Sequence, residues 1–553
     1  MSKPLIDVNG NPREQLSDLL KRHSVDCLTC PKAGKCEIQE LCARWQPKIK
    51  TLPVENENVD LGMLIERHPE RCIRCGSCAE FVRAAGEKAD TLPISKPVLS
   101  PLSGTLIDIC PAGALTDKTQ KKLIRVWETA AVQSIDVSDA ALADIKIETA
   151  AGEIVRITPA SEMPISDTAR FSFDGLRVNR LDRPYVRENG VLKECSWAEA
   201  LTAVADKLKN VSPQKAAALV GKFADGESML ALRDLLAAFG AHAVEARAGT
   251  EYFDGNSRQF HLFNTPFAKI KEADALLTIG VDLSEVLPAI DFAIRQNPMP
   301  RKEISDLSAL ETEKLFDSAK NPMVIVGAGV ANRRDAASAF EAIYRFCKQK
   351  NVIRGDWNGY NFVSDNTAFV GAAELGLISE TPLRPEIAAG KFDFVYLLDD
   401  DSVSRADLGD AFVVYQGFCA SRAARAADVI LPGVAPTEKH ATYVDAQGIA
   451  KSTAPALPPF GQAREDWKIL RALSEYAGTM PLPYDDLDAV RDALAGTSVV
   501  FYKRGELASA SDESFGTKGE LSGETVKSPD YKPDEICKNS ARMRALRRER
   551  RKP

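Results

Sequence analysis

Soft metal ligands are concentrated near the start of this 553-residue chain. The stretch HSVDCLTCPKAGKC contains His23, Cys27, Cys30 and Cys36, although the whole chain has only 5 His and 12 Cys. Imidazole and thiolate side chains are the ligands that zinc and iron–sulfur clusters prefer. The spacing H-x3-C-x2-C-x5-C therefore predicts one metal site with four protein ligands.

A second ligand set follows, with Cys72, Cys75 and Cys78 in CIRCGSC and Cys110 in DICPAGAL. C-x2-C-x2-C with a distant C-P pair is typical of a cubane [4Fe–4S] cluster. Gly76 allows the short loop to bend, so that backbone amides can point toward sulfide. A zinc site rarely uses three cysteines so close together. We therefore expect this set to hold a [4Fe–4S] cluster.

The fourth ligand of the first set is left open by the spacing alone. His23 fits the position, but it could also cap the helix suggested by Leu16, Leu19 and Leu20. Cys42 is the other candidate, and four cysteines at this spacing could bind zinc as well. A neutral imidazole in place of a thiolate would make a cluster less negative and easier to reduce.

Disulfide bonds are not expected from the distribution of the cysteines. Eight of the twelve lie in the first fifth of the chain, and only Cys195, Cys347, Cys419 and Cys537 lie beyond. A chain of this length can build a large core without disulfides, and CxxC spacing in a non-secreted protein favours metal binding.

The composition indicates a soluble globular protein of two to four domains, with 27% charged and 44% hydrophobic residues. A net charge of −7 gives no reason to expect nucleic acid as a partner. The sequence has no uninterrupted apolar run of the roughly 18 residues that a membrane span needs. We therefore expect membrane association only indirectly, through partners. The start MSKPLIDVNGNPREQ lacks the features of a secretory signal.

The elements that must position these ligands predict an α/β protein. We expect a cluster-binding region over residues 1–122 and a small β-rich domain over 123–180, where DIKIETAAGEIVRITP reads as a hairpin. Residues 181–482 contain apolar runs such as AAALVG, ALLTIG, MVIVGAG, FDFVYLLD, AFVVYQG and ADVILPG between helical stretches. Buried strands that end at glycine and alternate with helices predict a doubly wound parallel sheet.

Two further stretches have limited functional content. GAGVAN from Gly327 is a partial nucleotide-binding motif, which a close strand-to-helix turn explains without a nucleotide. Residues 483–553 read as an extended polar arm with a basic tail. The tail carries Arg542, Arg544, Arg547, Arg548, Arg550 and Arg551. Because its charge opposes that of the whole chain, we interpret it as a docking arm for an acidic partner surface rather than a solvated tail.

Several stretches together resemble a known family. HSVDCLTCPKAGKCEIQE, RCIRCGSCAEFVR and SGTLIDICPAGALT are similar to the large iron–sulfur subunit, the G type, of NADH:quinone oxidoreductase, respiratory complex I. ADVILPGVAPTEKHATYVDAQGIA and AREDWKILRALSE extend the resemblance over about residues 12 to 480. NRLDRPYVRENG and SWAEAL are also found in the wider molybdopterin oxidoreductase superfamily.

The resemblance implies two [4Fe–4S] clusters. It assigns His23, Cys27, Cys30 and Cys36 to the first and Cys72, Cys75, Cys78 and Cys110 to the second. It favours His23 over Cys42, which then becomes a packed thiol. It implies a relay of electrons from NADH and FMN, through the Cys72 cluster and then the His23 cluster, toward quinone.

The resemblance also implies the partners and the location. We expect other peripheral-arm subunits of complex I, including the FMN-binding subunit, at the matrix side of the mitochondrial inner membrane. The cytoplasmic side of a bacterial plasma membrane is the alternative. The family usually opens with a [2Fe–2S] ferredoxin domain, yet no cysteine precedes Cys27. We therefore expect a separate ferredoxin-like chain to carry the [2Fe–2S] cluster.

Two other classes of function have to be weighed against the relay. The chain could be a catalytic molybdopterin-dependent oxidoreductase, such as a formate dehydrogenase. Those enzymes place Cys, selenocysteine or Ser on the metal early in the large domain, but no cysteine lies between Cys195 and Cys347. We therefore expect no molybdopterin and no complete catalytic site. A zinc-stabilised assembly protein is the third class, and metal analysis separates all three.

Overall fold

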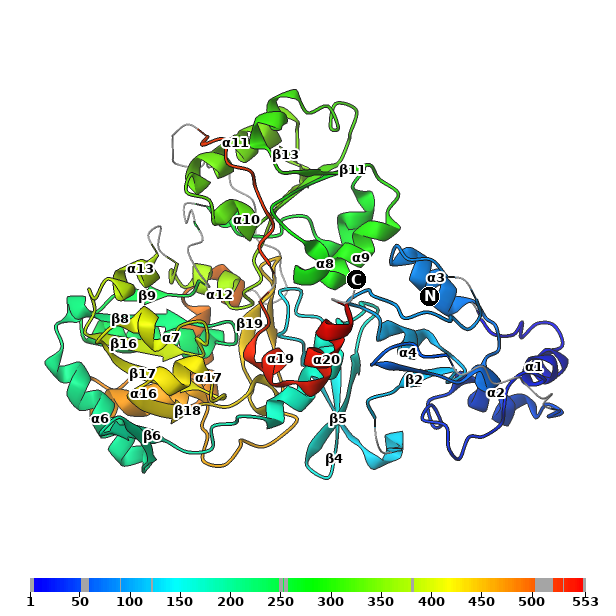
Figure 1. The fold of residues 1–553 in the computed structure, drawn as a ribbon, viewed down its shortest axis with the longest axis horizontal. Helices are drawn as coiled ribbons and strands as arrows, with labels where there is room; N and C mark the ends of the chain where they lie inside the picture. The colour runs from blue at the N-terminus through cyan, green and yellow to red at the C-terminus, as the bar shows by residue number, and fades with distance from the viewer. Residues whose placement is uncertain are drawn as a thin grey trace. The chain divides into compact units, whose positions relative to one another are not determined.

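The computed structural model describes residues 4–50, 59–89, 91–120, 123–247, 252, 257–378, 382–502, 521–530 and 532–550. The chain divides into two compact units, and neither is continuous in sequence (Figure 1). Unit 1 comprises Met1–Gln133, Ala143–Gly175 and Ile536–Pro553. Unit 2 comprises Ser134–Leu142 and Leu176–Glu535. The α/β class is confirmed, whereas the expected boundaries near residues 122, 180 and 482 stay predictions.

Unit 1 has short elements around its ligand-rich loops. Its first helices are α1 (Pro12–Leu20), α2 (Glu37–Trp45), α3 (Ser77–Ala84) and α4 (Thr105–Ile109). A 3-10 turn, η1 (Pro69–Arg71), precedes Cys72, and the strands β1 (Ile65–Arg67) and β2 (Leu115–Asp117) pair antiparallel. A small apolar core formed by Ile6, Leu16, Leu20, Cys36, Ile38 and Ala112 joins α1 and α2 to the loops. This core anchors the loop that carries the first ligand set.

The predicted hairpin is confirmed in unit 1. β4 (Asp144–Ala150) pairs antiparallel with β5 (Glu153–Pro159), and β3 (Ala130–Ile135) extends this sheet on the β4 side. The turn residues Ala151 and Gly152 both have positive φ, +51° and +76°. Two positive φ values are what a tight two-residue hairpin turn requires. The helix α5 (Asp167–Phe171) follows β5.

Among the described residues, unit 2 contains two larger sheets built mainly from parallel strands, where we expected one, and two further two-stranded pairs. The larger sheet has the order β7-β6-β18-β17-β16-β8-β9 and the smaller β11-β10-β12-β15. The first set of strands is β6 (Tyr185–Glu188), β7 (Val191–Glu194), β8 (Ala216–Val220), β9 (Ala243–Glu245), β16 (Phe394–Leu398), β17 (Phe412–Gly417) and β18 (Val429–Pro432). The second set is β10 (Ala275–Ile279), β11 (Arg301–Ile304), β12 (Pro322–Gly327) and β15 (Tyr360–Val363).

All six predicted apolar runs are strands, and each pairs with a parallel neighbour. The division of these strands between two sheets was not predicted, because buried parallel strands read alike, as continuous apolar runs. Such a run shows that a strand is covered on both faces, but it does not show which neighbour it joins.

The larger sheet is covered on both faces. Ala216, Ala218 and Val220 of β8 belong to one apolar core, while the alternate residues Ala217 and Leu219 belong to another. The first core includes side chains of α6 (Trp197–Asn210), α7 (Gly226–Ala238) and α16 (Asp466–Tyr476). The second includes side chains of α13 (Leu383–Ala388), α14 (Arg405–Leu408) and α15 (Arg422–Ala426). Because successive strand residues point to opposite faces, this division shows a doubly wound arrangement.

The smaller sheet carries the partial nucleotide motif. Gly327 ends β12, and α10 (Ala328–Ala331) follows at once. A Cβ atom at Gly329 would lie 2.2 Å from the carbonyl oxygen of Lys527 and 2.8 Å from the Cα of Gly280. Close packing of backbone against backbone thus accounts for these glycines. The helix α11 (Ala336–Gln349) and the paired strands β13 (Ile353–Arg354) and β14 (Trp357–Asn358) complete this region.

The C-terminal segment differs from the expected extended arm. The helices α17 (Leu487–Ala495) and α18 (Val499–Tyr502) contribute Val490, Leu494, Val500 and Phe501 to the larger core of unit 2. Residues 521–530 have no regular secondary structure, and residues 503–520 of the predicted arm lie outside the described part. The helices α19 (Glu535–Asn539) and α20 (Ala541–Arg550) complete the described C-terminal part.

The basic tail binds this chain's own residues rather than standing free. Arg550 Nη2 donates to Asp167 Oδ2 at 2.7 Å, and the Arg542 guanidinium lies 4.5 Å from the centre of the Phe173 ring. All four residues belong to unit 1. Asp167 thus balances the charge of Arg550, whereas Arg544 and Arg548 are exposed, and the docking of the tail on a partner stays a prediction. None of the described helices is long and apolar enough to cross a membrane.

Candidate iron–sulfur sites

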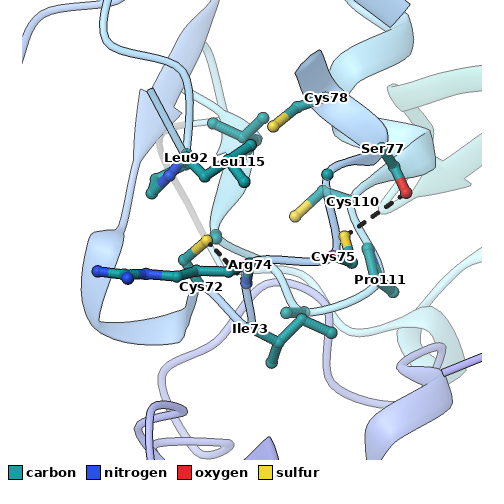
Figure 2. A pocket seen from close by; sticks show the side chains of 14 residues that line it. Cys72, Ile73, Arg74, Cys75, Ser77, Cys78, Leu92, Cys110, Pro111 and Leu115 are labelled. Atoms are coloured by element: carbon teal, nitrogen blue, oxygen red, sulfur yellow. Dashed lines mark hydrogen bonds between the residues drawn. The ribbon is translucent and has the colours of Figure 1, made fainter. Parts of the chain in front are cut away.

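The second predicted ligand set lines one pocket in unit 1. Cys72, Cys75, Cys78 and Cys110 all contribute to its wall, together with Leu92, Pro93, Pro111, Ala112 and Leu115. Figure 2 shows the four sulfur atoms directed toward a common space, from the loop, from α3 and from the segment after α4. Most of the other wall residues are apolar, although Arg74 and Ser77 also line the pocket and Cys75 is exposed.

The backbone around this pocket explains the spacing of its cysteines. Gly76 has φ +89° and caps α3, so the chain can turn from the Cys72–Cys75 loop into the helix that carries Cys78. The Arg74 amide donates to Cys72 Sγ at 3.4 Å. Cys110 follows the last residue of α4, and Pro111 then directs the chain away.

The four thiols influence one another. Burial raises the pKa of Cys72 to about 11, and the charges of Cys110, Cys78 and Cys75 contribute to the rise. Burial also raises the pKa of Cys78, with contributions from Cys110 and Cys75. A metal binds the thiolate form, so metal must displace protons that this environment otherwise retains. The group is therefore close enough to act as one site.

The helix α4, which leads to Cys110, is held by buried charge. Asp167 Oδ1 accepts from the Gly104 amide at 2.7 Å, and Asp167 Oδ2 accepts from Ser103 Oγ at 2.8 Å. Arg550 Nη2 adds its ion pair to the same carboxylate at 2.7 Å. Asp167 is buried, and so these contacts fix the start of the helix that presents Cys110.

The first predicted set lies in the loop between α1 and α2. Cys30 and Cys36 are buried, whereas Cys27 is half-buried. Arg125 Nη1 donates to the Cys30 carbonyl at 2.6 Å and the same guanidinium also binds the Leu28 carbonyl, which pins the loop. Cys36 caps the start of α2, and burial raises the pKa of its thiol.

His23 is held in a defined orientation. α1 ends at Leu20, and the imidazole is buried, with 6% of its surface exposed. Its Nδ1 lies 2.8 Å from the carbonyl oxygen of Arg71, so Nδ1 must carry the proton that it donates. Burial lowers the pKa of His23, which favours neutral imidazole. In this tautomer Nε2 carries the lone pair that a metal needs, and the carbonyl contact fixes the ring plane.

Cys42 lies close to the same group. It is half-buried on α2 and packs against the small core. Burial raises the pKa of its thiol, and the charges of Cys27 and Cys36 raise it further. The structure therefore brings both candidates for the fourth ligand, His23 and Cys42, to the cysteine loop, and the choice between them stays a prediction.

The two candidate sites share a wall formed by residues 110–113. Cys110 lines the second pocket, while the carbonyl of Pro111 accepts from Cys36 Sγ at 3.5 Å. A Cβ atom at Gly113, where φ is +67°, would lie 2.9 Å from Cys30 Sγ. A larger residue at this position would thus press on a predicted ligand. One short segment contacts ligands of both sets, and so the sites are neighbours.

The ligand spacing that a single zinc ion needs differs from the spacing that a cluster needs. Among the described residues, no group of three or more His, Cys, Asp or Glu side chains is arranged to hold one metal ion. A tetrahedral zinc site needs thiolates about 3.8 Å apart, because each lies about 2.3 Å from the ion. A cubane cluster binds one cysteine at each iron corner and spaces the thiolates more widely.

The large unit also gathers charge, at the carboxyl ends of its parallel strands. Lys439 Nζ pairs with Asp225 Oδ2 at 2.6 Å and with Asp466 Oδ2 at 2.8 Å, and all three side chains are buried. A Cβ atom at Gly221, which follows β8, would lie 1.8 Å from the carbonyl oxygen of Asp399, which follows β16. This edge, where doubly wound folds commonly bind ligands, is filled by the protein's own residues.

Neither Arg71 nor the buried cluster of Lys439, Asp225 and Asp466 was predicted from the sequence. Arg71 precedes a predicted ligand by one residue, and Asp26 precedes Cys27 in the same way, so a matching pair of opposite charges was present in the sequence. The pairing itself depends on the fold. Lys439, Asp225 and Asp466 are far apart in sequence and carry no shared spacing signal.

Comparison with known proteins first defines the class. Residues 180–309 and 309–476 match the molybdopterin oxidoreductase family, and residues 13–48 match the NADH-ubiquinone oxidoreductase-G iron-sulfur binding region. Acetylene hydratase from Pelobacter acetylenicus is a solved structure with a similar fold. Its TM-score is 0.50 at 12% identity, with 69% of this chain and 74% of that chain covered. The large unit is therefore of the molybdopterin oxidoreductase fold class.

The more similar relatives define the particular family. The chain is 36% identical to NADH dehydrogenase [ubiquinone] iron-sulfur protein 1 of Solanum tuberosum, with 86% of this chain and 70% of the relative covered. It is 32% identical to the G-type subunit of the NADH-quinone oxidoreductase of Rickettsia felis, with 95% and 84% covered. The chain belongs to the family of G-type iron–sulfur subunits of NADH-quinone oxidoreductase, complex I, as the resemblance in its sequence implied.

Proposed function

We propose that the chain transfers electrons within an NADH:quinone oxidoreductase by holding two [4Fe–4S] clusters close together. The single observation that carries this proposal is the contact of residues 110–113 with ligands of both sets. A [4Fe–4S] cluster supplies the chemistry, because it takes up and gives back one electron at a time. The protein keeps the two sites near each other and largely dry, and it orients their ligands.

We assign Cys72, Cys75, Cys78 and Cys110 to one cluster. The shared pocket and the mutual effect of the thiols on their pKa values support this assignment. We assign His23, Cys27, Cys30 and Cys36 to the other. The buried ring, its donated hydrogen bond and the family match over residues 13–48 support that assignment.

The experiment uses the assembled oxidoreductase and three single variants. His23→Ala should remove or alter the EPR signal of one reduced cluster, and Cys110→Ser should do so for the other. Cys42→Ser is the control for a nearby thiol and should leave both signals and the iron content unchanged. If Cys42→Ser abolishes a cluster while His23→Ala leaves its spectrum intact, Cys42 is the fourth ligand.

His23→Cys adds a test of the ligand's electrical effect. A thiolate in place of a neutral imidazole makes the cluster more negative, so its reduction potential should fall if the cluster still assembles. An unchanged or raised potential, measured in an EPR-monitored redox titration, would contradict ligation by His23.

We further propose that the large unit holds no molybdopterin. The strand edge where such a fold would bind a ligand is occupied by Lys439 with Asp225 and Asp466 and by the approach of Asp399 to Gly221. Stoichiometric molybdenum or tungsten with pterin in the purified complex would contradict this and would favour the catalytic alternative. Zinc without iron or sulfide would favour the assembly-protein alternative.

The other subunits of the oxidoreductase are the partners that family membership implies. We propose that the FMN-binding subunit is the source of electrons. We place the chain at the matrix side of the mitochondrial inner membrane, with the cytoplasmic side of a bacterial membrane as the alternative. Identification of every chain that co-purifies with the native assembly tests the partners, and immunogold labelling tests the location.

A further inference from the structure

Arg71 is a buried cation beside the first candidate site. The residue is only 5% exposed. Its Nε donates to Asp26 at 3.1 Å, and its Nη2 forms the ion pair with the same carboxylate. Because Asp26 immediately precedes Cys27, this pair fixes the guanidinium against the loop that carries the predicted ligands.

One donor of this guanidinium is not accounted for by the protein. In the part of the chain that the structure describes, Nη1 of Arg71 is buried and has no hydrogen-bond partner. Leaving a buried donor unsatisfied is costly, and more so for a charged group, so such donors normally have a partner. The orphaned N–H therefore points to a group that binds there.

The residues around Arg71 indicate that the missing acceptor of its Nη1 is an anion. The guanidinium of Arg71 binds Asp26, which precedes the predicted ligand Cys27, and the carbonyl oxygen of Arg71 accepts from the predicted ligand His23. A cluster with thiolate and sulfide around its iron atoms presents the acceptor that this donor lacks.

The backbone of Arg71 is tied to the same site. Its carbonyl oxygen accepts from Nδ1 of His23 at 2.8 Å, and its peptide leads directly into Cys72 of the neighbouring set. The main chain of Arg71 therefore orients one predicted ligand, while its side chain brings a positive charge to the same place. A side-chain substitution leaves the main-chain contact available.

We propose that Nη1 of Arg71 donates a hydrogen bond to the cluster held by His23, Cys27, Cys30 and Cys36, and that this contact raises its reduction potential. The inference rests on the proposed function. Reduction adds one negative charge to the cluster, so a fixed cation and donor stabilise the reduced form more than the oxidised form. Arg71 is a positioning and tuning residue, and it exchanges no proton or electron itself.

Arg71→Met in the assembled complex tests the proposal, because methionine keeps much of the bulk but has neither charge nor donor. At a fixed applied potential, the ratio of oxidised to reduced His23 cluster should rise about tenfold, equivalent to about 59 mV for one electron. The potential of the Cys72 cluster should change less. EPR-monitored redox titration measures both.

Arg180→Met is the matched control. The side chain of Arg180 is 6% exposed, as is that of Arg71, and it also forms a buried ion pair, with Glu438 at 2.7 Å. It lies in unit 2, where no cluster is proposed. Its loss should leave both potentials unchanged. An equal shift in Arg180→Met and Arg71→Met would overturn the proposal.

A second variant and a measurement on the unaltered protein keep the test decisive if Arg71→Met loses the cluster. Arg71→Gln keeps a small donor and loses the charge, so it should shift the potential in the same direction but less. In protein labelled with ¹⁵N in the arginine guanidinium, pulsed EPR of the reduced cluster should show coupling to ¹⁵N. Unchanged potential in both variants, or no such coupling, overturns the proposal.

These results separate the two proposals. If both clusters are present on the assigned ligands and the potential is independent of Arg71, only the role of Arg71 fails. If His23→Ala, Cys27→Ser and Cys30→Ser leave every cluster signal intact, the assignment of the first site fails, and the role of Arg71 fails with it.

Discussion

The candidate cluster sites of unit 1 and the strand edge of unit 2 both bury polar groups, but they satisfy them differently. In unit 1, buried thiols have raised pKa values and Arg71 Nη1 has no partner among the described residues. In unit 2, Lys439 is buried between two carboxylates that bind it directly. The first region needs another group to complete it, whereas the second is complete in itself.

The apolar cores beside the two regions also differ. The small core beside the first ligand loop includes the predicted ligand Cys36 and few other buried side chains. In unit 2 the central strand β16 is apolar and buried, with Val395, Leu397 and Leu398 fully buried. We therefore expect bound metal to contribute more to the stability of unit 1, and apolar burial to contribute more to the stability of unit 2.

Iron removal should have the largest effect, and it should act on one unit. Metal binding to thiolates contributes directly to folding, so chelation should unfold the ligand loops of unit 1, about residues 23–36 and 72–110. The strands β8, β16 and β17 should keep their protection. Hydrogen exchange measured by mass spectrometry, with and without iron, checks this. Equal loss of protection in both units would break the comparison.

Lys439→Met tests the strand edge of unit 2, where this buried lysine is paired with two aspartates of the same chain. It leaves Asp225 and Asp466 buried without their cation, and such a loss typically costs about 3–5 kcal/mol. Denaturant unfolding followed by fluorescence measures the free energy, and iron content should stay unchanged. Lys468→Met, which removes an exposed ion pair with Glu465, is the control and should cost less than about 1 kcal/mol. A comparable cost in both variants would contradict our interpretation.

Acidification should destabilise unit 2 through Glu374. Burial raises the pKa of this carboxyl, but hydrogen bonds from His261, Arg258 and Ser498 more than offset it and lower the pKa to about 2. Its folded pKa lies below the ordinary 4.5, so its contribution is present above pH 4.5 and is lost as the pH falls toward 2. The contribution is about 3 kcal/mol.

Glu374→Gln checks this sign. The variant should be less stable than the parent at pH 7 and should lose less stability between pH 4.5 and pH 2. Glu475→Gln, which removes one carboxylate partner of Arg471 at a more exposed site while Asp485 remains, is the control. Parallel pH profiles for the parent and Glu374→Gln, from thermal unfolding of unit 2, would contradict the assignment.

Ala151→Asn should have the smallest effect, and it should be independent of iron. Ala151 has φ +51°, a conformation that costs a non-glycine residue about 1 kcal/mol and that asparagine tolerates better. The change creates an Asn-Gly turn between β4 and β5, the pair that favours such hairpins. Hydrogen exchange of the hairpin should slow to the same extent with and without iron, and Ala160→Asn serves as the control outside the turn.

The sequence by itself determined the ligand types, their spacing and the apolar runs. C-x2-C-x2-C forms a loop because a few residues can turn around one centre, and Gly76 adopts the positive φ that this loop needs. The six apolar runs are strands, and the AAGE turn is a hairpin. These features depend on neighbouring residues, which a sequence displays directly.

Only the tertiary structure decided how distant segments meet. It divided the strands between two sheets, brought α20 into unit 1 and set Pro111 and Gly113 against Cys36 and Cys30. It also placed Arg71 beside Asp26 and buried Lys439 between two aspartates. Ion pairs and backbone contacts depend on how far apart two groups lie in space, because Coulomb and van der Waals energies fall as that distance grows. The number of residues between the two groups in the sequence does not enter these energies.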